Sequence, residues 1–326
     1  MKKILVAGAG GFIGGYLTKE LISLGHQVTA VDVKPQSDWY QVQSTAMNFT
    51  RDLSILEECE KSVVGIDEVY NLAADMGGMG FIENNKAACM LSVLINTHLL
   101  MAAKTAKVSK FFFASSACVY NASMQDTTDN PGLKESDVYP AMPEDGYGWE
   151  KLFSERMCRH FYEDYGIETR VARYHNVYGP LGTWDGGREK APAALSRKVA
   201  FAKRDGANSI EIWGDGEQTR SFTYIEDCIK GTLLLMESDI REPLNIGSDQ
   251  MISINKMVDI LEGIAGVQLL RDHDLTAPKG VRGRNSDNTK INELLGWAPS
   301  ISLEIGLKAT YDWIQSQITQ QVRSDN

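Results

Sequence analysis

Residues 2–14, KKILVAGAGGFIG, join a short aliphatic run to glycines at positions 8, 10, 11 and 14. The run predicts a β-strand from Lys3 to Ala7, and apolar residues recurring every three or four positions predict a helix from Phe12 to Leu24. Glycines between a strand and a helix permit a tight turn and let a pyrophosphate approach the helix N-terminus. The stretch therefore predicts a dinucleotide-binding turn. Its expected cofactor contacts are Gly8, Gly11, Phe12, Ile13 and Gly14.

A second strand, predicted from Gln27 to Val33, carries the residue expected to choose between cofactors. Asp32 near its end is placed to accept hydrogen bonds from a ribose 2′-OH and to repel a 2′-phosphate. NAD is therefore expected rather than NADP, although the neighbouring Lys34 would soften that selection. The alternative, a glycine-rich turn without a ligand, is disfavoured because the acidic residue stands where the motif requires it.

The first half of the chain alternates β-branched runs with helical patterns, which is typical of βαβ units. Further strands are predicted at Glu68–Leu72, Lys110–Ser115 and Glu168–Tyr174, and further helices at Ala88–Ala106 and Tyr147–Tyr165. The expected fold class is α/β, with a doubly wound parallel (Rossmann) sheet. After Pro180 the elements shorten, with helices near Ala191–Lys203, Ile225–Glu237, Ile254–Ala265 and Leu303–Gln317. We therefore expect an NAD-binding Rossmann domain over residues 1–180 and a smaller α/β substrate-binding lobe over residues 181–326, with some exchange of chain between the two.

The composition limits the partners that the chain can have. The 326 residues are 43% hydrophobic and carry a formal net charge of −10, which argues against non-specific binding to nucleic acid or to an anionic membrane surface. An anionic substrate would need local arginines. No apolar run is judged long enough to span a bilayer, and glycines interrupt the N-terminal run that would otherwise form a signal peptide. Five scattered cysteines without a Cys-x-x-Cys motif indicate free thiols, no metal site and a cytoplasmic location.

Three polar residues form a candidate catalytic set. The Tyr-x-x-x-Lys spacing of Tyr147 and Lys151 places both side chains on one face of a helix, one turn apart. There the ammonium can stabilise a phenolate, so the tyrosine can take a proton from a substrate hydroxyl while hydride leaves for the cofactor. Ser116, after a predicted strand, would steady the substrate oxygen. The set predicts a hydride-transfer site in which Tyr147 and Lys151 also contact the cofactor.

Together with this site, several segments resemble the extended short-chain dehydrogenase/reductases that act on nucleotide sugars, the NAD-dependent epimerase/dehydratase family. The matching segments are residues 8–14, 71–74, 115–120, 147–151 and 173–180. The resemblance covers nearly the whole chain. It implies a Rossmann fold, bound NAD, a nucleotide-sugar substrate and a cofactor contact at Ala73.

Less common segments narrow the resemblance to the members of this family that invert C3 and C5 of GDP-mannose to give GDP-L-galactose, with GDP-L-gulose as a side product. These segments are residues 74–82, 116–118, 182–194, 213–222 and 281–288. The resemblance implies that Tyr147 deprotonates the 4-OH while NAD takes hydride from C4, and the ketone then makes the hydrogens at C3 and C5 exchangeable. It assigns the two proton-transfer groups to Cys118 and Lys190. Hydride returns to C4 at the end, so the overall reaction consumes no redox equivalents.

Several alternatives stay open from the residues alone. A 4,6-dehydratase is disfavoured because it needs a carboxylic acid in the Ser116 loop, where this chain has Cys118. A nucleotide-sugar 4-epimerase needs only Ser116, Tyr147 and Lys151. A non-catalytic NAD-binding sensor would have no need of an activated tyrosine. Interpreted as ordinary structural residues, Cys118 would be a small buried side chain and Lys190 a solvated surface lysine.

Substrate anchoring is expected from residues of the second half and from one glycine-rich loop. A diphosphate bound to an acidic protein needs local cations, and the candidates are Arg220, Arg282 and Arg284, each of which could instead pair with a nearby carboxylate. The resemblance adds Asn176, which would position the sugar or its phosphates. Further contacts are expected at Gly77, Met79 and Gly80, whose backbone can approach the hexose, and at Glu189 beside Lys190. Members of the family often dimerise through two helices, which implies a homodimer built on Ala88–Ala106 and Trp149–Tyr165.

Overall fold

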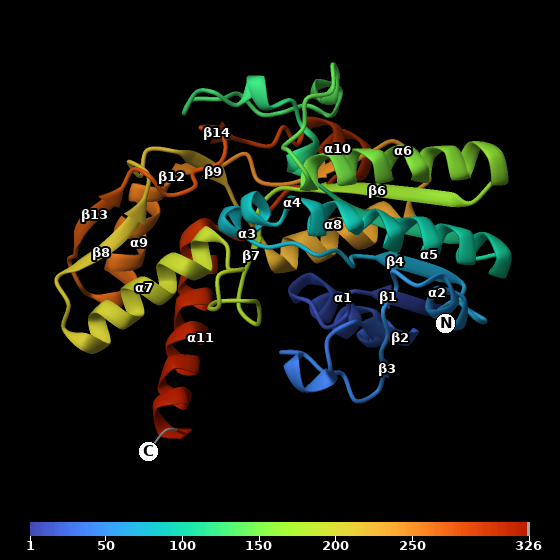
Figure 1. The fold of residues 1–326 in the computed structure, drawn as a ribbon, viewed down its shortest axis with the longest axis horizontal. Coiled ribbons are helices and arrows are strands. Elements are labelled where there is room, and N and C mark those ends of the chain that lie inside the picture. Colours follow the sequence, from blue (N-terminus) through green and yellow to red (C-terminus); the bar gives the residue numbers. More distant parts are fainter. Residues whose placement is uncertain (325–326) are drawn as a thin grey trace.

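The computed structural model describes residues 1–324, and its centre is a sheet of seven strands (Figure 1). The strand order from one edge to the other is β11 (Leu244–Ile246), β6 (Glu168–Tyr174), β5 (Lys110–Ser116), β4 (Glu68–Asn71), β1 (Lys3–Ala7), β2 (Gln27–Asp32) and β3 (Met47–Thr50). Every neighbouring pair runs parallel. The order β3-β2-β1-β4-β5-β6 is that of the Rossmann sheet, which confirms the predicted fold class.

Both faces of this sheet are buried, because successive side chains of a strand point to opposite sides. In β1, Ile4 and Val6 belong to one apolar cluster, while Leu5 and Ala7 belong to another. Helices α1 (Phe12–Ser23) and α8 (Ile225–Glu237) cover the first face. The second face is covered by α2 (Leu56–Ser62), α5 (Val93–Ala106) and α6 (Tyr147–Tyr165).

Two strands and the division of one helix differ from the expectations drawn from the sequence. β3 is four residues long and mostly exposed, and β11 is three residues long, so neither leaves a clear periodic signal. The helix predicted over Ala88–Ala106 begins earlier and is divided at Ser92 into α4 (Lys86–Leu91) and α5. The Ser92 hydroxyl accepts a hydrogen bond from the Asp75 amide at 2.9 Å, which ties this break to the loop after β4.

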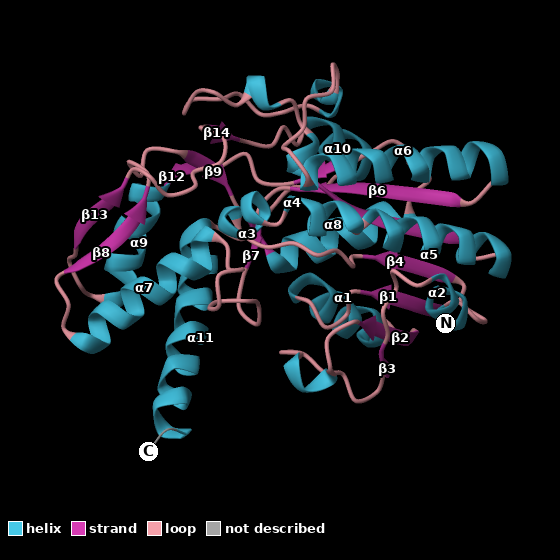
Figure 2. Cartoon of the chain, in the orientation of Figure 1, coloured by secondary structure: helices cyan, strands magenta, loops and turns pink. Residues whose placement is uncertain are grey.

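The second lobe combines short strands with helices (Figure 2), among them the 22-residue α11 (Leu303–Ser324), so the shortening expected after Pro180 applies only to its strands. β8 (Ser209–Trp213) pairs with β13 (Leu270–Asp274), and β9 (Thr219–Ser221) lies between β12 (Met251–Ser253) and β14 (Gly283–Arg284). Helices α7 (Ala191–Asp205), α9 (Ile254–Ala265) and α11 pack against one another. Their buried side chains continue the apolar cluster on the α1 face of the central sheet, so the two lobes share one core.

Short elements complete the fold between these layers. β7 (Val177–Tyr178) pairs with β10 (Thr223–Tyr224), and two further helices are α3 (Met79–Asn84) and α10 (Thr289–Leu295). Single turns of 3₁₀ helix occur at Gln36–Asp38, Ala117–Val119, Ala122–Met124 and Glu135–Val138. The second of these turns and α3 matter for function, because both follow central strands of the sheet at the edge where ligands bind in this fold.

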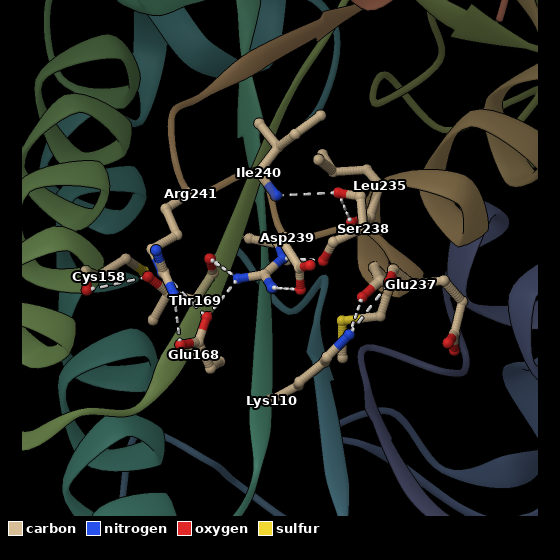
Figure 3. A network of polar contacts seen from close by, with 12 residues as sticks. Lys110, Cys158, Glu168, Thr169, Leu235, Glu237, Ser238, Asp239, Ile240 and Arg241 are labelled. Atoms are coloured by element: carbon tan, nitrogen blue, oxygen red, sulfur yellow. Dashed lines mark hydrogen bonds and ion pairs between the residues drawn. The ribbon is translucent and has the colours of Figure 1, made fainter. Parts of the chain in front are cut away.

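The chain returns to the first lobe after residue 180, because α8 and β11 pack on β6. Figure 3 shows polar contacts that anchor this return. Lys110, at the start of β5, donates from Nζ to a carbonyl oxygen near the end of α8 at 2.9 Å, and Arg170 donates from Nε to the carbonyl that follows α8 at 2.8 Å. Arg241 and Glu168 form an ion pair at 2.9 Å. Residue 180 therefore does not separate two independent stretches of chain, and the division into two domains stays a prediction.

One helical segment, Lys86–Ala106, is long and apolar enough by length and composition to cross a membrane, which corrects the expectation that no such stretch exists. It comprises α4 and α5, and 39% of its apolar window is buried inside the protein. α5 packs against α2, α6 and the central sheet. The outer side of the segment exposes Leu91, Leu94 and Met101. The segment therefore covers the sheet through α5 and has an apolar outer side.

Candidate active site

The glycine-rich turn between β1 and α1 is shaped for a close approach of backbone to a ligand. Gly8 has a φ of +84°, and a Cβ on it would lie 2.8 Å from the amide nitrogen of Ala73, just after β4. α1 begins after Gly11, which has no side chain to cap the first turn of the helix. The amides of Phe12 and Ile13 in that turn are donors of the kind that bind a pyrophosphate. The residues present therefore fit NAD.

Asp32 ends β2, at the position expected for a ribose contact. It is buried, and its Oδ1 accepts a hydrogen bond from the Lys34 amide at 3.0 Å. No donor within residues 1–324 is bound to its other oxygen, which is thus available to a ribose hydroxyl. The Lys34 ammonium donates to the Gly10 carbonyl oxygen at 2.7 Å. The cation that was expected to soften the cofactor selection is therefore engaged by the turn itself.

Ser116, Tyr147 and Lys151 lie where β5 and α6 meet. Ser116 is the last residue of β5, and Tyr147 is the first residue of α6. The helical spacing places the Lys151 ammonium 5.4 Å from the centroid of the Tyr147 ring and 4.8 Å from that of Phe113. Tyr147 and Lys151 are 5% and 3% exposed. The sequence-predicted trio is therefore brought together in a buried position.

The protonation of Tyr147 differs from what its spacing to Lys151 predicts. Burial raises the pKa of Tyr147 well above its usual value, and the neighbouring Cys118 and Glu150 raise it further, whereas the Ser116 side chain lowers it. The Lys151 ammonium, which was expected to lower this pKa, lies 3.4 Å from a carboxylate oxygen of Glu150. In this arrangement Tyr147 is a neutral phenol.

Cys118 follows Ser116 in a single 3₁₀ turn and is 7% exposed. The Arg284 guanidinium approaches its sulfur, with Nη1 3.6 Å from Sγ. The same guanidinium forms an ion pair with the Glu144 carboxylate and donates from Nε to Gln125 Oε1 at 2.6 Å. Burial and the Glu144 charge raise the pKa of the Cys118 thiol to about 11, against the opposing effect of Arg284. Cys118 is therefore a protonated thiol in a charged cluster rather than a side chain with only apolar neighbours.

Lys190 is the residue from which α7 begins, and it is half-buried. Burial lowers the pKa of its ammonium, and the nearby Arg284 lowers it further, whereas the neighbouring Cys118 raises it. Among residues 1–324 no carboxylate forms an ion pair with Lys190 Nζ. The structure thus brings Lys190 from the second half of the chain to the cluster that contains Cys118, and it does not leave it as a solvated surface lysine.

The three candidate arginines have different partners. Arg284 is 4% exposed and is engaged by Glu144 and Cys118. Arg282 forms an ion pair with Asp215 at 2.8 Å, which matches the alternative considered from the sequence. In the described part of the chain Arg220 donates only to backbone carbonyls, those of Thr219, Lys279 and Val281. Burial lowers the pKa of Arg220 to about 10. A cation without a carboxylate partner is the best prepared of the three for a diphosphate.

The glycine-rich loop before α3 reaches the second lobe. A Cβ on Gly80 would lie 3.2 Å from the ring of Trp213, and the Met79 side chain lies against Gly280. Gly77 packs against the Phe81 side chain at the start of α3. The loop therefore lies between the end of β4 and the second lobe, and its Phe81 packs against the cluster that contains Cys118 and Tyr147.

Two further predicted contacts use their polar groups within the protein. The Asn176 side chain, on a residue with a φ of +42°, donates from Nδ2 to the Ser221 carbonyl oxygen at 3.0 Å. It therefore joins the end of β6 to β9. The Glu189 carboxylate forms an ion pair with Arg197 at 2.6 Å and so braces its own loop.

Reasoning from the sequence missed Glu144 and Gln125, which hold Arg284 beside the thiol. Both belong to segments outside the regular helices and strands, and neither is part of a motif with a recognised spacing. Only the folded arrangement brings them to Cys118. The one feature of the sequence that could have indicated Glu144 is its position three residues before Tyr147.

Comparison with known proteins agrees with this site. A model of the NAD dependent epimerase/dehydratase family matches residues 4–247 of the chain. A GDP-mannose 3,5-epimerase of Oryza sativa subsp. japonica is 48% identical over 320 residues, which cover 98% of this chain and 83% of that protein. The GDP-mannose 3,5-epimerase of Arabidopsis thaliana is 47% identical, covering 98% of this chain and 84% of that protein.

Solved structures show the same fold over both lobes. A UDP-glucose 4-epimerase from Thermotoga maritima, solved with UDP-glucose, has a TM-score of 0.87 at 27% identity, covering 97% of this chain and 99% of that one. A UDP-glucuronic acid 4-epimerase from Bacillus cereus, solved with UDP-glucuronic acid and NAD, has a TM-score of 0.83 at 29% identity, with the same coverage. From its turn, its catalytic trio and these matches, the chain belongs to the NAD-dependent epimerase/dehydratase family.

Proposed function

We propose that the chain is a GDP-mannose 3,5-epimerase, which converts GDP-mannose to GDP-L-galactose with GDP-L-gulose as a side product. The proposal is supported by two observations: Cys118 and Tyr147 pack in one apolar cluster, and Lys190 lies beside the glycine-rich loop, its Cα 3.8 Å from a Cβ on Gly78. A 4-epimerase has no use for this second pair of proton-transfer groups, whereas inversion of carbon centres through an enolate requires it. The identity to the Oryza and Arabidopsis enzymes supports the same substrate.

The first step is oxidation at C4 of the hexose. When bound by the glycine turn and Asp32, NAD would supply the acceptor and donor of hydride, and its oxidised ring would favour a phenolate at Tyr147. Lys151 adds a second cation, 5.4 Å from the Tyr147 ring. The phenolate takes the proton of the 4-OH, and the Ser116 hydroxyl holds the same oxygen in place.

The second step is exchange of protons on carbon. The C4 ketone acidifies the hydrogens on C3 and C5, so each centre can be inverted through an enolate. Lys190 has a lowered pKa, which favours the neutral amine that can remove a proton. Cys118 has a raised pKa and holds a proton ready for delivery. We place these two groups on opposite faces of the hexose, because inversion requires removal from one face and delivery to the other.

The diphosphate is assigned to Arg220. Its guanidinium is bound only to carbonyl oxygens within residues 1–324, so its positive charge is not neutralised by an ion pair. Arg284 also carries a charge in the same cluster, but Glu144 compensates it. A diphosphate would therefore gain more from Arg220 than from Arg284 or Arg282.

Incubation of the purified protein with GDP-mannose in deuterated water tests the proposal. We expect deuterium at C3 and C5 of the recovered nucleotide sugar, together with GDP-L-galactose. Absence of exchange at both carbons would sink the proposed activity. The second candidate, a nucleotide-sugar 4-epimerase, is favoured by the solved structures with UDP-linked sugars. Inversion of UDP-glucose at C4 without deuterium at C3 or C5 would establish that candidate instead.

Two further properties complete the proposal. A homodimer is supported by apolar side chains exposed on the outer sides of α4, α5 and α6; these are Met90, Leu91, Met101, Trp149 and Phe153, exposed by 48%, 61%, 42%, 45% and 53%. Phe153→Glu should convert the dimer to a monomer in light-scattering measurements, and a monomeric wild type would overturn this assembly. A cytoplasmic location is supported by five free cysteines, all buried. Cell fractionation that finds the protein outside the cytoplasm would contradict it.

A further inference from the structure

The loop that carries Lys190 is held from two sides. We call residues 184–190 the lysine loop. It begins at Trp184, which is 3% exposed, and ends at Lys190, from which α7 starts. Glu189 inside the loop forms an ion pair with Arg197 on α7 at 2.6 Å, and its other carboxylate oxygen accepts a hydrogen bond from the Gly187 amide at 2.7 Å. One side of the loop is thus fixed to its own helix.

The other side of the lysine loop touches the glycine-rich loop before α3. The Gly78 amide donates to the carbonyl oxygen of Arg188 at 3.0 Å. A Cβ on Gly78 would lie 2.4 Å from the carbonyl oxygen of Glu189, so the two backbones meet at van der Waals distance. This backbone contact lies directly beside Lys190 in the sequence.

The Arg188 side chain closes this contact with three interactions across the two loops. Its Nη1 lies 2.6 Å from Asp75 Oδ1 and 3.3 Å from the Met76 carbonyl oxygen. Its Cζ lies 3.7 Å from the centroid of the Phe81 ring, which is a cation–π contact. Asp75 is itself fixed, because its amide donates to the Ser92 hydroxyl at 2.9 Å. The guanidinium therefore binds the segment of residues 75–81, which is anchored to the helices of the first lobe.

Residues 75–81 also pack on the catalytic side chains. Met76 and Phe81 lie against the apolar cluster that contains Cys118 and Tyr147. Arg188 thus connects the lysine loop to Met76 and Phe81, the residues that pack beside the Cys118 thiol. Lys190 makes no ion pair of its own with residues 1–324, so its neighbours determine where the amine lies.

We propose that Arg188 is a positioning residue, whose contacts with Asp75, Met76 and Phe81 hold Lys190 in place for proton transfer to or from the substrate carbon. This inference rests on the proposed function. The Arg188 and Asp75 side chains are 47% and 43% exposed, so their ion pair adds little to global stability. Its effect falls on the geometry of one loop, and a displacement of about 1 Å at a reacting group can cost roughly a hundredfold in rate.

The test compares two partial reactions in the holoenzyme. GDP-mannose is added in deuterated water, and the reduction of bound NAD and the incorporation of deuterium at C3 and C5 are both measured. In Arg188→Ala we expect deuterium incorporation to fall roughly tenfold or more, while reduction of bound NAD stays within about twofold of wild type. Asp75→Asn should give a similar result, and the two changes together should cost no more than the larger single effect.

Arg204→Ala is the matched control. Arg204 lies on α7, with its Cζ 4.6 Å from the Phe201 ring centroid and its Nε 2.6 Å from Asp205, so it has the same kinds of contact without joining two loops. It should leave both partial reactions and the thermal unfolding midpoint as in wild type. Arg188→Lys keeps the charge but not the planar group, and should restore only part of the exchange.

Two results would overturn the inference. Unchanged exchange in Arg188→Ala shows that the contact does not position Lys190. An equal loss of NAD reduction and of exchange shows a general structural role. Failure of the wild type itself to exchange deuterium is a different result: it removes the proposed function, and the positioning role falls with it.

Discussion

Replacing Glu144 by Gln should make the Cys118 thiol more acidic. In the structure the Glu144 carboxylate neutralises Arg284, whose Nη1 lies 3.6 Å from the Cys118 sulfur. Gln has nearly the same shape but no charge, so the guanidinium would act on the thiol unopposed. The thiolate, which the native cluster disfavours, would then face a full positive charge.

The magnitude follows from this geometry. A unit charge at 3.6 Å stabilises a thiolate by about 4–5 kcal/mol at an effective dielectric constant of about 20. In the native protein the Glu144 carboxylate cancels much of this stabilisation. If the substitution restores one third to two thirds of it, the thiol becomes about ten to a hundred times more acidic. With a thiol pKa of about 11, about one Cys118 in ten thousand is ionised at pH 7, and the substitution should raise this to between about one in a thousand and one in a hundred.

Alkylation with iodoacetamide, followed by mass spectrometry of the Cys118 peptide, reports the thiolate population as a function of pH. Glu144→Gln should react about ten to a hundred times faster than wild type at pH 7, because only the thiolate is nucleophilic. Asp145→Asn is the matched control, since it removes the same charge from the adjacent residue, whose carboxylate pairs with Lys86 at 2.7 Å. Equal rates in Glu144→Gln and wild type would refute the claim that Glu144 keeps the thiol protonated.

Four other substitutions, of which Arg282→Ala is the control for Arg220→Ala, test the remaining assignments. Tyr147→Phe should lower turnover roughly 10²–10⁴-fold, and bound NAD should no longer be reduced on mixing with GDP-mannose in a stopped-flow experiment; normal reduction would exclude Tyr147 as the base. Arg220→Ala should raise the KM for GDP-mannose about tenfold or more, whereas Arg282→Ala, already paired with Asp215, should change it less than about threefold; the reverse order would move the diphosphate site. Asp32→Ala should reduce the preference for NAD over NADP in fluorescence titrations, by about tenfold in the ratio of the two dissociation constants, and an unchanged ratio would show that another group makes the selection.

The parts of the fold that could be predicted are those that a short stretch of sequence determines by itself. The glycine turn, Asp32 and the Tyr147–Lys151 spacing each depend on one strand end or one helix face, where sequence distance fixes spatial distance. β11 was not predicted because three residues are too few to show a hydrophobic periodicity. It joins the sheet only after the chain has built part of the second lobe. Short strands of this kind are fixed by tertiary pairing.

The surroundings of the thiol could not be predicted in the same way. From its charge the sequence predicts that Arg284 binds the diphosphate, whereas the structure places its guanidinium against Cys118 and Glu144. These three residues come from separate segments outside the long helices, so no periodicity relates them. The residue types indicated that a thiol, a carboxylate and a guanidinium were present. Only the folded arrangement of the loops showed that Arg284 acts on Cys118.

The central claim is that Cys118 and Lys190 move protons on carbon at the same site where Tyr147 supports oxidation at C4. The double variant Cys118→Ala/Lys190→Ala, incubated with GDP-mannose in deuterated water, separates these two activities. We expect bound NAD to be reduced within about threefold of the wild-type rate, because the oxidation set is intact, while no deuterium enters C3 or C5. Deuterium incorporation at the wild-type rate in this variant would contradict the claim.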